Sequence, residues 1–468
     1  MTTTLLDRPF FFVGIGGSGM LPLALILRGL GATVAGSDRS RDQGRTPEKF
    51  AFLAAQGIAL HPQDGSGVTA PEQVLVASAA IEDTVPEVAR ARELGCARMS
   101  RAELLASLFN AAPTSIGVAG TSGKSTTTAM LGWILAHETR DPTIMNGAVM
   151  KNFVAPDMPF ASARVGNGDL FVSEVDESDG SIALYRPSVA VLLNVSLDHK
   201  SMDELRALFS DFLGVAGRAA VNFDDPEARA LVQDGAVTGF GIASEDATIG
   251  IEPDSIIENP TSISARILDR ATGTAHDLHL PMPGRHNLAN ALAAIAGAHA
   301  AGVPVAQAVA ALASFKGLAR RFDIVGTSPS GVTVIDDFGH NPEKCRATLR
   351  TLKSQPGRVL AFFQPHGYGP LRQMGAELAE VFARELGPED HAILCDPVYF
   401  GGTVDRSEGS ERIVDLIRDH GGSAEYIPDR ADCATRLTKL ARPGDRIVVM
   451  GARDDTLSEF AHDLLARL

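Results

Sequence analysis

Residues 116–128 constrain this chain more than any other segment, because they combine a glycine-rich turn, a lysine and adjacent hydroxyl groups. Backbone N–H groups of such a turn can surround a phosphate, and the Lys124 ammonium can neutralise it. Ser125 or Thr126 can bind Mg²⁺ where the following helix begins. The segment departs from the strict phosphate-loop pattern at Val118, where that pattern has Gly. The alternative is a strand-to-helix turn with no ligand, but such a turn does not explain why Lys-Ser-Thr follows the glycines. We therefore predict ATP binding by a loop of seven residues. These are Gly120, Thr121, Ser122, Gly123, Lys124, Ser125 and Thr126.

Composition sets the size and the class of the molecule. A chain of 468 residues should divide into about three domains. Its hydrophobic fraction of 45% and charged fraction of 21% are typical of a globular protein. The net charge is −15 and no block of Lys and Arg occurs, so we expect neither a nucleic-acid partner nor binding to an anionic membrane.

Cysteine spacing and the apolar opening indicate a cytoplasmic protein. Cys96, Cys345, Cys395 and Cys433 have no paired spacing typical of zinc or redox sites, which favours reduced thiols. The apolar stretch near residues 10–27 is interrupted by glycines and lacks a cleavage-like pattern, so it predicts a strand and turn rather than a signal segment. No uninterrupted apolar run is long enough to span a bilayer.

Short apolar runs alternate with amphipathic segments along the chain, which predicts α/β layers around parallel sheets. Three regions follow from this pattern: residues 1–112, 113–319 and 320–468, with a linker at Ala112-Pro113. Near residues 245–280 the periodicity is weaker, and we expect antiparallel strands there. The expected buried strands are 10–13, 33–36, 74–77, 170–172, 189–193, 332–336, 359–363, 392–394 and 446–450.

A second glycine-rich turn, Gly14-x-Gly-x-x-Gly19, follows the first expected strand, and Asp38 ends the next one. This pattern is typical of turns that place a pyrophosphate or ribose at a helix N-terminus. Alone this pattern is weak evidence for a ligand site, because an α/β turn with a purely structural role would have the same sequence.

Carboxylates and a histidine follow the expected strands of the middle region. Glu174 can hold Mg²⁺ directly or through water, since hard cations prefer carboxylate oxygens. His199, after Asp198, can bind a second metal ion or orient a phosphate oxygen. Asp176, Glu177 and Asp179 also fit a solvated acidic turn, so we predict only Glu174 of this run as a ligand.

Further polar groups occur at helix and strand ends in the last third of the chain. Asn287 and Asn290 can contact adenine or cap a helix, and the sequence alone does not separate these roles. Arg320 and Arg321 offer guanidinium groups to phosphate or carboxylate. Two strand-end motifs follow, Asp336-Asp-Phe-Gly-His-Asn-Pro342 and Gln364-Pro-His-Gly-Tyr368.

Taken in order, these motifs resemble those of the Mur ligases, the ATP-dependent amide-forming enzymes of peptidoglycan synthesis, over nearly the whole chain. The likeness is greatest to the alanine-adding branch. The matching segments are Gly14–Met20, Ser37-Asp38, Gly120–Thr126, Glu174–Asp179, Asp198-His199, Gly284–Asn290, Arg320–Phe322, Asp336–His340 and Gln364–His366.

The resemblance implies an α/β protein of three domains. Residues 1–112 would form a Rossmann-like domain for the UDP-linked substrate, and residues 113–319 a central P-loop ATPase-like domain for ATP and Mg²⁺. Residues 320–468 would form a Rossmann-like C-terminal domain that brings the amino acid. A substrate carboxylate would attack the γ-phosphorus of ATP, and an amine would then displace phosphate from the acyl phosphate.

The resemblance also implies roles for individual residues. The catalytic residues would be Lys124, Glu174, His199, Arg321 and His340, and the metal ligands Ser125, Glu174 and His199. Asn290, Arg321 and Asp337 would join the phosphate loop in binding the nucleotide. The acceptor and amino acid would contact Gly16, Gly17, Ser18, Gly19, Asp38, Ser78, His366 and Tyr368. The partners would be a UDP-sugar carboxylate and an amino acid or short peptide, bound by a monomer or homodimer in the cytoplasm.

One segment departs from the alanine-adding pattern. That pattern has Arg-Tyr and a second Arg after Gln-Pro-His, whereas this chain has Gly367-Tyr368-Gly369-Pro370 and a displaced Arg372. Because a guanidinium that would bind the substrate carboxylate is missing there, the group that is added could be a different amino acid, or a peptide as in recycling ligases. A catalytically silent nucleotide-binding regulator is a further alternative, and the glycine turn at 14–19 is the only support for a nicotinamide oxidoreductase.

Overall fold

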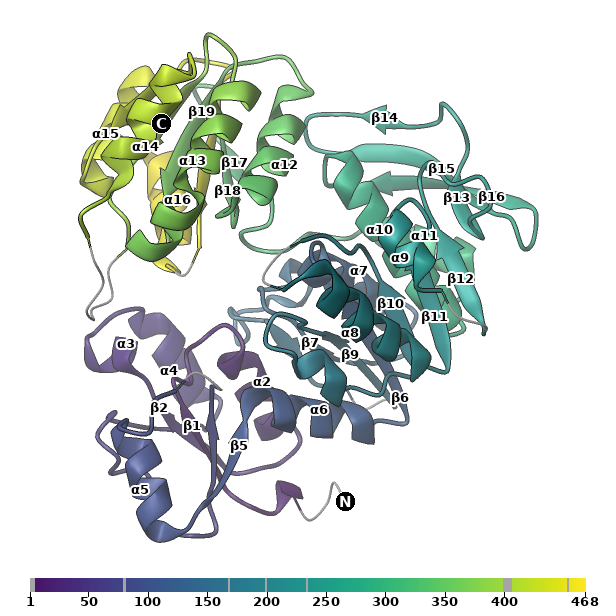
Figure 1. The fold of residues 1–468 in the computed structure, drawn as a ribbon, viewed down its shortest axis with the longest axis vertical. Helices are drawn as coiled ribbons and strands as arrows, with labels where there is room; N and C mark the ends of the chain where they lie inside the picture. The colour runs from purple at the N-terminus through teal and green to yellow at the C-terminus, as the bar shows by residue number, and fades with distance from the viewer. Residues whose placement is uncertain are drawn as a thin grey trace. The chain divides into compact units, whose positions relative to one another are not determined.

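The computed structural model describes residues 5–78, 81–166, 169–197, 200–232, 235–398, 406–452 and 454–468. The chain forms two compact units (Figure 1). The first comprises residues 1–258, 262–281 and 285–317, and the second comprises residues 318–468 with the short segments 259–261 and 282–284. The chain therefore enters the second unit briefly twice before it stays there.

The N-terminal part of the first unit is a parallel sheet of order β3-β2-β1-β4-β5, the order of a Rossmann fold without its sixth strand. Its strands are β1 (Phe10–Val13), β2 (Val34–Ser37), β3 (Ala59–His61), β4 (Val74–Ala77) and β5 (Ala97–Ser100). The helices are α2 (Met20–Gly29), α3 (Arg39–Asp42), α4 (Pro47–Ala55), α5 (Pro86–Leu94) and α6 (Arg101–Ala111). Strand β1 is apolar throughout because both faces are covered: Phe10 and Phe12 join one core, and Phe11 and Val13 the other.

The rest of the first unit is built on an eleven-stranded sheet. Its order is β14-β15-β13-β12-β11-β10-β6-β9-β7-β8, with β16 paired to β15. The strands are β6 (Thr114–Ala119), β7 (Thr143–Met145), β8 (Ala163–Arg164), β9 (Leu170–Glu174), β10 (Val189–Leu192), β11 (Arg218–Asn222), β12 (Val237–Phe240), β13 (Ile249–Ile251), β14 (Ile257–Glu258), β15 (Ile263–Asp269) and β16 (Thr274–Leu280). As expected for residues 245–280, β13 to β16 pair in antiparallel fashion.

Helices cover this central sheet. They are α7 (Lys124–His137), α8 (Met202–Gly214), α9 (Pro226–Ala230), α10 (Arg285–Ala300) and α11 (Val305–Leu312), with 3-10 turns η1 (Lys151–Phe153) and η2 (Ser181–Leu184). The Ala-rich helix α10 is buried along most of its length and packs against α7. The small side chains of α10 let the two helices pack closely, and this packing holds α7, the helix that begins at the phosphate loop, in place.

The second unit is a six-stranded sheet of order β17-β18-β22-β19-β20-β21, with helices on both faces. Its strands are β17 (Asp323–Thr327), β18 (Thr333–Asp337), β19 (Val359–Gln364), β20 (His391–Leu394), β21 (Ala424–Tyr426) and β22 (Arg446–Gly451). The helices are α12 (Pro342–Lys353), α13 (Tyr368–Glu385), α14 (Ser410–Asp419), α15 (Arg430–Leu440) and α16 (Thr456–Arg467). Helices α12, α13 and α14 cover one face, and α15 and α16 the other.

Most expected strands are confirmed within two residues of their predicted ends. The strands that were not predicted include β3, β5, β7, β8, β11, β12, β17 and β21. All four cysteines are free, as expected. Within the described part of the chain, no helix is both long and apolar enough to cross a membrane. The predicted domain boundaries after residues 112 and 319 stay predictions.

Candidate functional site

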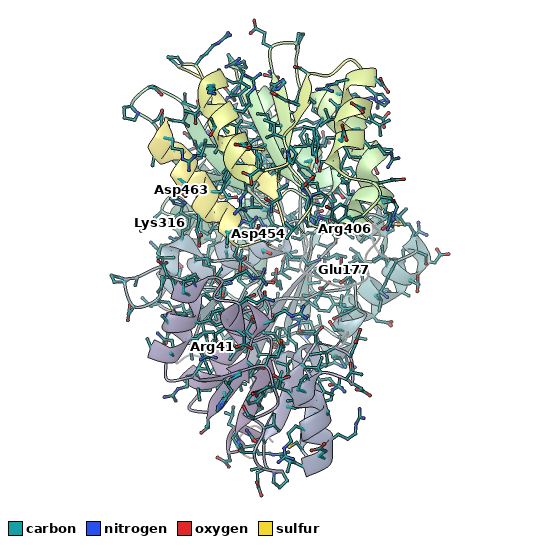
Figure 2. The ribbon with its side chains drawn as sticks, turned by 90° about the vertical axis from the view of Figure 1, so that its left-hand side faces the viewer. Arg41, Glu177, Lys316, Arg406, Asp454 and Asp463 are labelled. Carbon is teal, nitrogen blue, oxygen red and sulfur yellow. The ribbon has the colours of Figure 1, made fainter. Side chains whose placement is uncertain are left out.

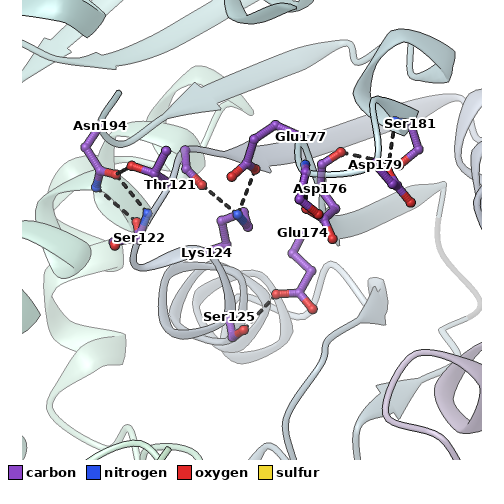
Figure 3. A network of polar contacts seen from close by, with 12 residues as sticks. Thr121, Ser122, Lys124, Ser125, Glu174, Asp176, Glu177, Asp179, Ser181 and Asn194 are labelled. Carbon is purple, nitrogen blue, oxygen red and sulfur yellow. Dashed lines mark hydrogen bonds and ion pairs between the residues drawn. The ribbon is translucent and has the colours of Figure 1, made fainter. Parts of the chain in front are cut away.

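Three neighbouring parallel strands place the phosphate loop and its polar surroundings at one sheet edge. Strand β6 lies between β9 and β10, so the loop after β6 is flanked by Glu174 at the end of β9 and Asn194 just after β10. Carboxyl ends of parallel strands share an edge, which is where α/β proteins bind ligands. Figure 3 shows the resulting network of contacts.

The loop needs glycine at two positions. Gly120 has φ +136° and Gly123 has φ +89°, values that other residues rarely adopt. A Cβ atom on Gly123 would collide with the Asn290 amide oxygen, and one on Gly120 would lie 3.0 Å from the Leu193 side chain. The predicted loop is therefore shaped by glycine and supported from β10 and α10.

Asn194 holds the loop in place. Its amide oxygen accepts hydrogen bonds from the Thr121 hydroxyl and the Ser122 backbone N–H, both at 2.8 Å, and its amide nitrogen donates to the Ser122 carbonyl at 3.0 Å (Figure 3). We did not predict this residue as part of the site. Its place directly after a buried strand was the available signal.

Lys124 makes two contacts within the loop network. Its ammonium donates to the Gly120 carbonyl at 2.7 Å and to a Glu177 carboxylate oxygen at 2.8 Å. The Glu177 side chain is only 4% exposed. Figure 2 labels Glu177 among the side chains of the first unit. Reading Glu177 as part of a solvated acidic turn was therefore wrong, because its carboxylate is buried against the lysine.

Neighbouring carboxyls of the loop after β9 have opposite pKa shifts. Burial raises the pKa of Glu177, and the attraction of Lys124 only partly offsets this. Burial would also raise the pKa of Asp176, but the Ser178 hydrogen bonds and the Lys124 charge outweigh it, and the pKa is lowered. One carboxyl is thus held ionised while its neighbour is shifted toward the protonated form.

Ser125 and Glu174 form the pair best suited to Mg²⁺. The Ser125 hydroxyl donates to the Glu174 carboxylate at 2.7 Å, and the Asn146 amide holds the Ser125 carbonyl at 2.9 Å. A Cβ on Gly147 would lie 2.5 Å from the Glu174 carboxylate, so that glycine leaves room for it. Hydroxyl and carboxylate oxygens are the ligands Mg²⁺ takes together with substrate phosphates.

The remaining predicted metal ligand cannot be placed. His199 and the preceding Asp198 lie outside the described residues. Within the described ranges, no group of three or more Asp, Glu, His or Cys side chains forms a cluster that would bind a metal ion unaided. Ser125 and Glu174 thus fit a cation that also takes oxygens from the nucleotide.

The first glycine turn is braced by Asp38. One carboxylate oxygen accepts from the Gly16 N–H and the other from the Ser40 N–H, both at 2.8 Å. The Arg101 side chain packs over Gly19, and its guanidinium lies 3.9 Å from Asp179. The other predicted residues of this group, Gly17 and Ser18, are exposed on the turn, and Ser78 is exposed after β4.

The structure resolves the two readings of the asparagines of α10. The helix begins at Arg285, so neither Asn287 nor Asn290 is a cap residue. The Asn290 amide oxygen faces the phosphate loop beside Gly123 and accepts from the Thr127 hydroxyl at 3.4 Å. Asn290 therefore lies where the loop meets α10, and its contact with adenine stays a prediction.

Arg320, one of the paired arginines of the second unit, is not available to a ligand. Its guanidinium donates to the backbone carbonyls of Gly451 and Asp454 and lies 3.6 Å from Asp336. The expectation that both arginines offer a fork was wrong for this residue, because strand ends bury it. Arg321 is partly exposed and stacks on Phe338 at 4.2 Å.

Asp337 organises the turn after β18. Its carboxylate accepts from the Phe322 N–H at 2.8 Å, the Gly339 N–H at 2.9 Å and the Thr348 hydroxyl at 2.8 Å. The side chain is nearly buried. The predicted ribose contact would thus use an oxygen that the fold already holds in one orientation.

Aromatic rings from two strand ends meet near Arg321. Phe338 and His340 have ring centroids 5.3 Å apart, and His340 and His366 5.0 Å apart. Burial, aided by the positive charge of Lys344, lowers the pKa of His340 to about 3. His340 is therefore neutral at physiological pH and accepts or donates through an uncharged ring.

A polar cluster at the carboxyl edge of the second sheet was not predicted. Asp454 accepts from the Gln364 amide at 2.8 Å and from the Arg430 guanidinium at 3.0 Å, and Arg430 also donates to Thr456 at 2.9 Å. Figure 2 labels Asp454 in the second unit. Tyr368, which we expected at the substrate, begins helix α13 close to this edge and is partly exposed.

Family models match almost the whole chain. The model of the Mur ligase family, catalytic domain, matches residues 9–112. The Mur ligase middle domain matches residues 118–298, and the Mur ligase glutamate ligase domain matches residues 320–453. These three matches account for the α/β architecture of three domains.

Curated relatives and solved structures agree with these models. The UDP-N-acetylmuramate–L-alanine ligase of Streptomyces avermitilis is 34% identical over 99% of this chain and 98% of its own. That of Agrobacterium fabrum is 36% identical over 95% and 94%. The crystal structure of the UDP-N-acetylmuramate-alanine ligase MurC from Thermotoga maritima has 25% identity and a TM-score of 0.81, covering 98% of this chain and 99% of its own. The chain therefore belongs to the Mur ligase family.

Proposed function

We propose that this chain is the ATP-dependent ligase that joins L-alanine to UDP-N-acetylmuramate in peptidoglycan synthesis, forming ADP and phosphate. The observation that carries the proposal is likeness over the full length: relatives of that name match 95% or more of this chain at 34–36% identity. The phosphate loop, with its lysine and paired hydroxyl and carboxylate, supplies the chemistry that such a reaction needs.

In the first step, the lactyl carboxylate of the acceptor attacks the γ-phosphorus of ATP and ADP leaves. The N–H groups of the loop bind the phosphates, and the Lys124 ammonium neutralises negative charge on the transferring phosphoryl group. To do so the lysine would share its ammonium between the phosphate and Glu177, which it contacts in this structure. Asn194 keeps the loop in shape throughout, since it bonds to loop residues rather than to the nucleotide.

Mg²⁺ would be held by Ser125, Glu174 and His199, of which the described pair lies in hydrogen-bond contact. When bound, it supplies positive charge that offsets the negative charge of the phosphate oxygens. Glu174 and Ser125 provide oxygen ligands from two different elements, β9 and α7, so the ion site depends on the packing of the central sheet.

In the second step, the amine attacks the acyl phosphate and phosphate leaves. Arg321, His340 and Asp337 would contribute from the C-terminal domain. Asp337 ends β18 and His340 follows it, while Arg321 comes before β17 and stacks on Phe338. Closing the site against water protects the acyl phosphate from hydrolysis. Because the ring of His340 is neutral, it does not repel the positively charged ammonium of the approaching amino acid.

The test is ATP-dependent phosphate release with UDP-N-acetylmuramate and a panel of amines: single amino acids and the short peptides of the cell wall. Turnover with L-alanine alone is expected. Turnover with a peptide or another amino acid would move the specificity, and the glycine in place of arginine at 367 is the feature that favours such a result. No turnover with any amine would contradict the proposal.

A further inference from the structure

Glu177 has no role in the mechanism as described so far, although it touches the catalytic lysine. Its carboxylate oxygen lies 2.8 Å from the Lys124 ammonium, and its side chain is 4% exposed. A buried carboxylate is costly unless it is paired. Lys124 supplies the pairing, and it would have to share its ammonium with a phosphate once a nucleotide binds.

Binding of ATP therefore changes the surroundings of Glu177. A γ-phosphate that draws the Lys124 ammonium toward itself would weaken the pairing of the buried Glu177 carboxylate. The charged groups that face it are Lys124 from α7 and Asp176 from its own loop. Both a phosphate and a neighbouring carboxylate disfavour a second negative charge, so a proton or a cation at Glu177 becomes favourable.

The incoming amine supplies such a cation. It reaches the site as an ammonium and must lose a proton before its nitrogen can attack. We propose that Glu177 binds the ammonium group of the incoming amino acid and takes that proton. The proposal rests on the proposed ligase function, and it adds a catalytic residue to that same site.

The step balances as follows. The ammonium nitrogen gives one proton to a Glu177 oxygen, and its freed lone pair forms the C–N bond at the acyl carbon while the carbonyl π electrons move to oxygen. Collapse restores the C=O bond and breaks the C–O bond to phosphate, which leaves with that electron pair. The phosphate takes the second nitrogen proton, and Glu177 returns its own to solvent before the next turnover.

Contrast between adjacent carboxyls supports this assignment. The pKa of Asp176 is lowered, because Ser178 and Lys124 outweigh its burial, whereas burial raises the pKa of Glu177. A proton acceptor works best when its pKa approaches the working pH, and only Glu177 is shifted in that direction. Asp176, one residue away on the same loop, is therefore a matched control.

The experiment compares two nucleophiles. L-Alanine is mostly protonated near neutral pH, whereas hydroxylamine is mostly neutral and attacks acyl phosphates without a base. We measure phosphate release, and hydroxamate for the second nucleophile, with ATP, Mg²⁺ and UDP-N-acetylmuramate for wild type, Glu177→Gln and Asp176→Asn. For Glu177→Gln, turnover with alanine should fall about 10²- to 10⁴-fold, while turnover with hydroxylamine stays within about fivefold.

Equal losses with both nucleophiles would mean that Glu177 only positions Lys124, and would overturn the proposal. So would unchanged turnover with alanine. Asp176→Asn should affect both nucleophiles equally. As a second measurement, the alanine rate of Glu177→Gln should rise with pH more steeply than that of wild type, because solution then supplies the free amine. If the wild type turns over hydroxylamine but no amine from the panel, both the proposed function and this inference are wrong. A loss in Glu177→Gln that is confined to alanine supports both.

Discussion

Lys124 is the residue on which we expect phosphoryl transfer to depend most directly. Removing its ammonium leaves charge on the transferring phosphoryl group uncompensated, so Lys124→Ala should lower kcat/KM for ATP by about 10³-fold. Steady-state phosphate release measures this. Lys316, an exposed lysine of the same unit labelled in Figure 2, is the control, and Lys316→Ala should stay within about twofold. Activity of Lys124→Ala within tenfold of wild type would contradict the assignment.

His340 makes a prediction about pH. Its pKa in the folded chain is about 3, against 6.5 ordinarily, so the unfolded chain binds the proton first as the pH falls. The stability due to the neutral ring is present above about pH 6.5 and is lost as the pH falls toward 3. Between pH 7 and 4, wild type should lose more thermal stability than His340→Gln, whose side chain does not titrate. Parallel curves for the two proteins would show that the ring titrates normally.

Individual residues differ in how far their sequence context reveals them. The strand-to-helix turn at residues 120–126 could be predicted from its glycines, and Gly120 and Gly123 do have positive φ. Phosphate binding by this turn stays a prediction. Glu177, Asn194 and Arg430 could not be assigned, because their roles depend on partners 53, 72 and 24 positions away, respectively. Nothing local distinguishes a buried carboxylate that contacts a lysine from a solvated one.

At the scale of elements, the turn between β6 and α7 allows a direct test of packing. Gly123 and Gly31 have nearly the same φ, +89° and +93°, but only Gly123 is crowded, by the Asn290 amide. Gly31→Ala should cost about 1 kcal/mol of unfolding free energy from backbone strain alone. Gly123→Ala should cost about 1–3 kcal/mol more, because Asn290 must move. Urea unfolding of both variants measures the difference, and equal losses would contradict the packing argument.

Several buried strands could be predicted almost to the residue, since strands covered on both faces appear in the sequence as unbroken apolar runs, as at Phe10–Val13 and Val359–Gln364. The shorter buried strands β7 and β11 were not predicted. Strand β17 (Asp323–Thr327) escaped detection because it lies at the sheet edge, is only partly buried and carries no such run. The roles of Asn287 and Asn290 were ambiguous, since asparagine often caps helices, but both residues lie inside α10.

At the scale of the whole molecule, the order of motifs was more informative than any single one. Each glycine turn alone occurs in many α/β proteins, but the order of all the motifs along the 468 residues matches one family. Motifs alone do not show which segments a bound ligand contacts, so this has to be measured with ligands present. Hydrogen exchange with and without ligands shows which segments become protected on binding.

A non-hydrolysable ATP analogue with Mg²⁺ should slow amide exchange around residues 120–127 by about 100-fold when its concentration is about 100 times its dissociation constant. If Arg321, Asp337 and His340 contact the bound nucleotide, exchange around residues 336–340 should slow in the same experiment. UDP alone should protect the turn near residues 14–19 and leave residues 336–340 unchanged. Protection confined to the phosphate loop would remove these three residues from the nucleotide site and leave them to the amino acid. Core strand β22 (Arg446–Gly451), buried in either case, serves as the internal reference.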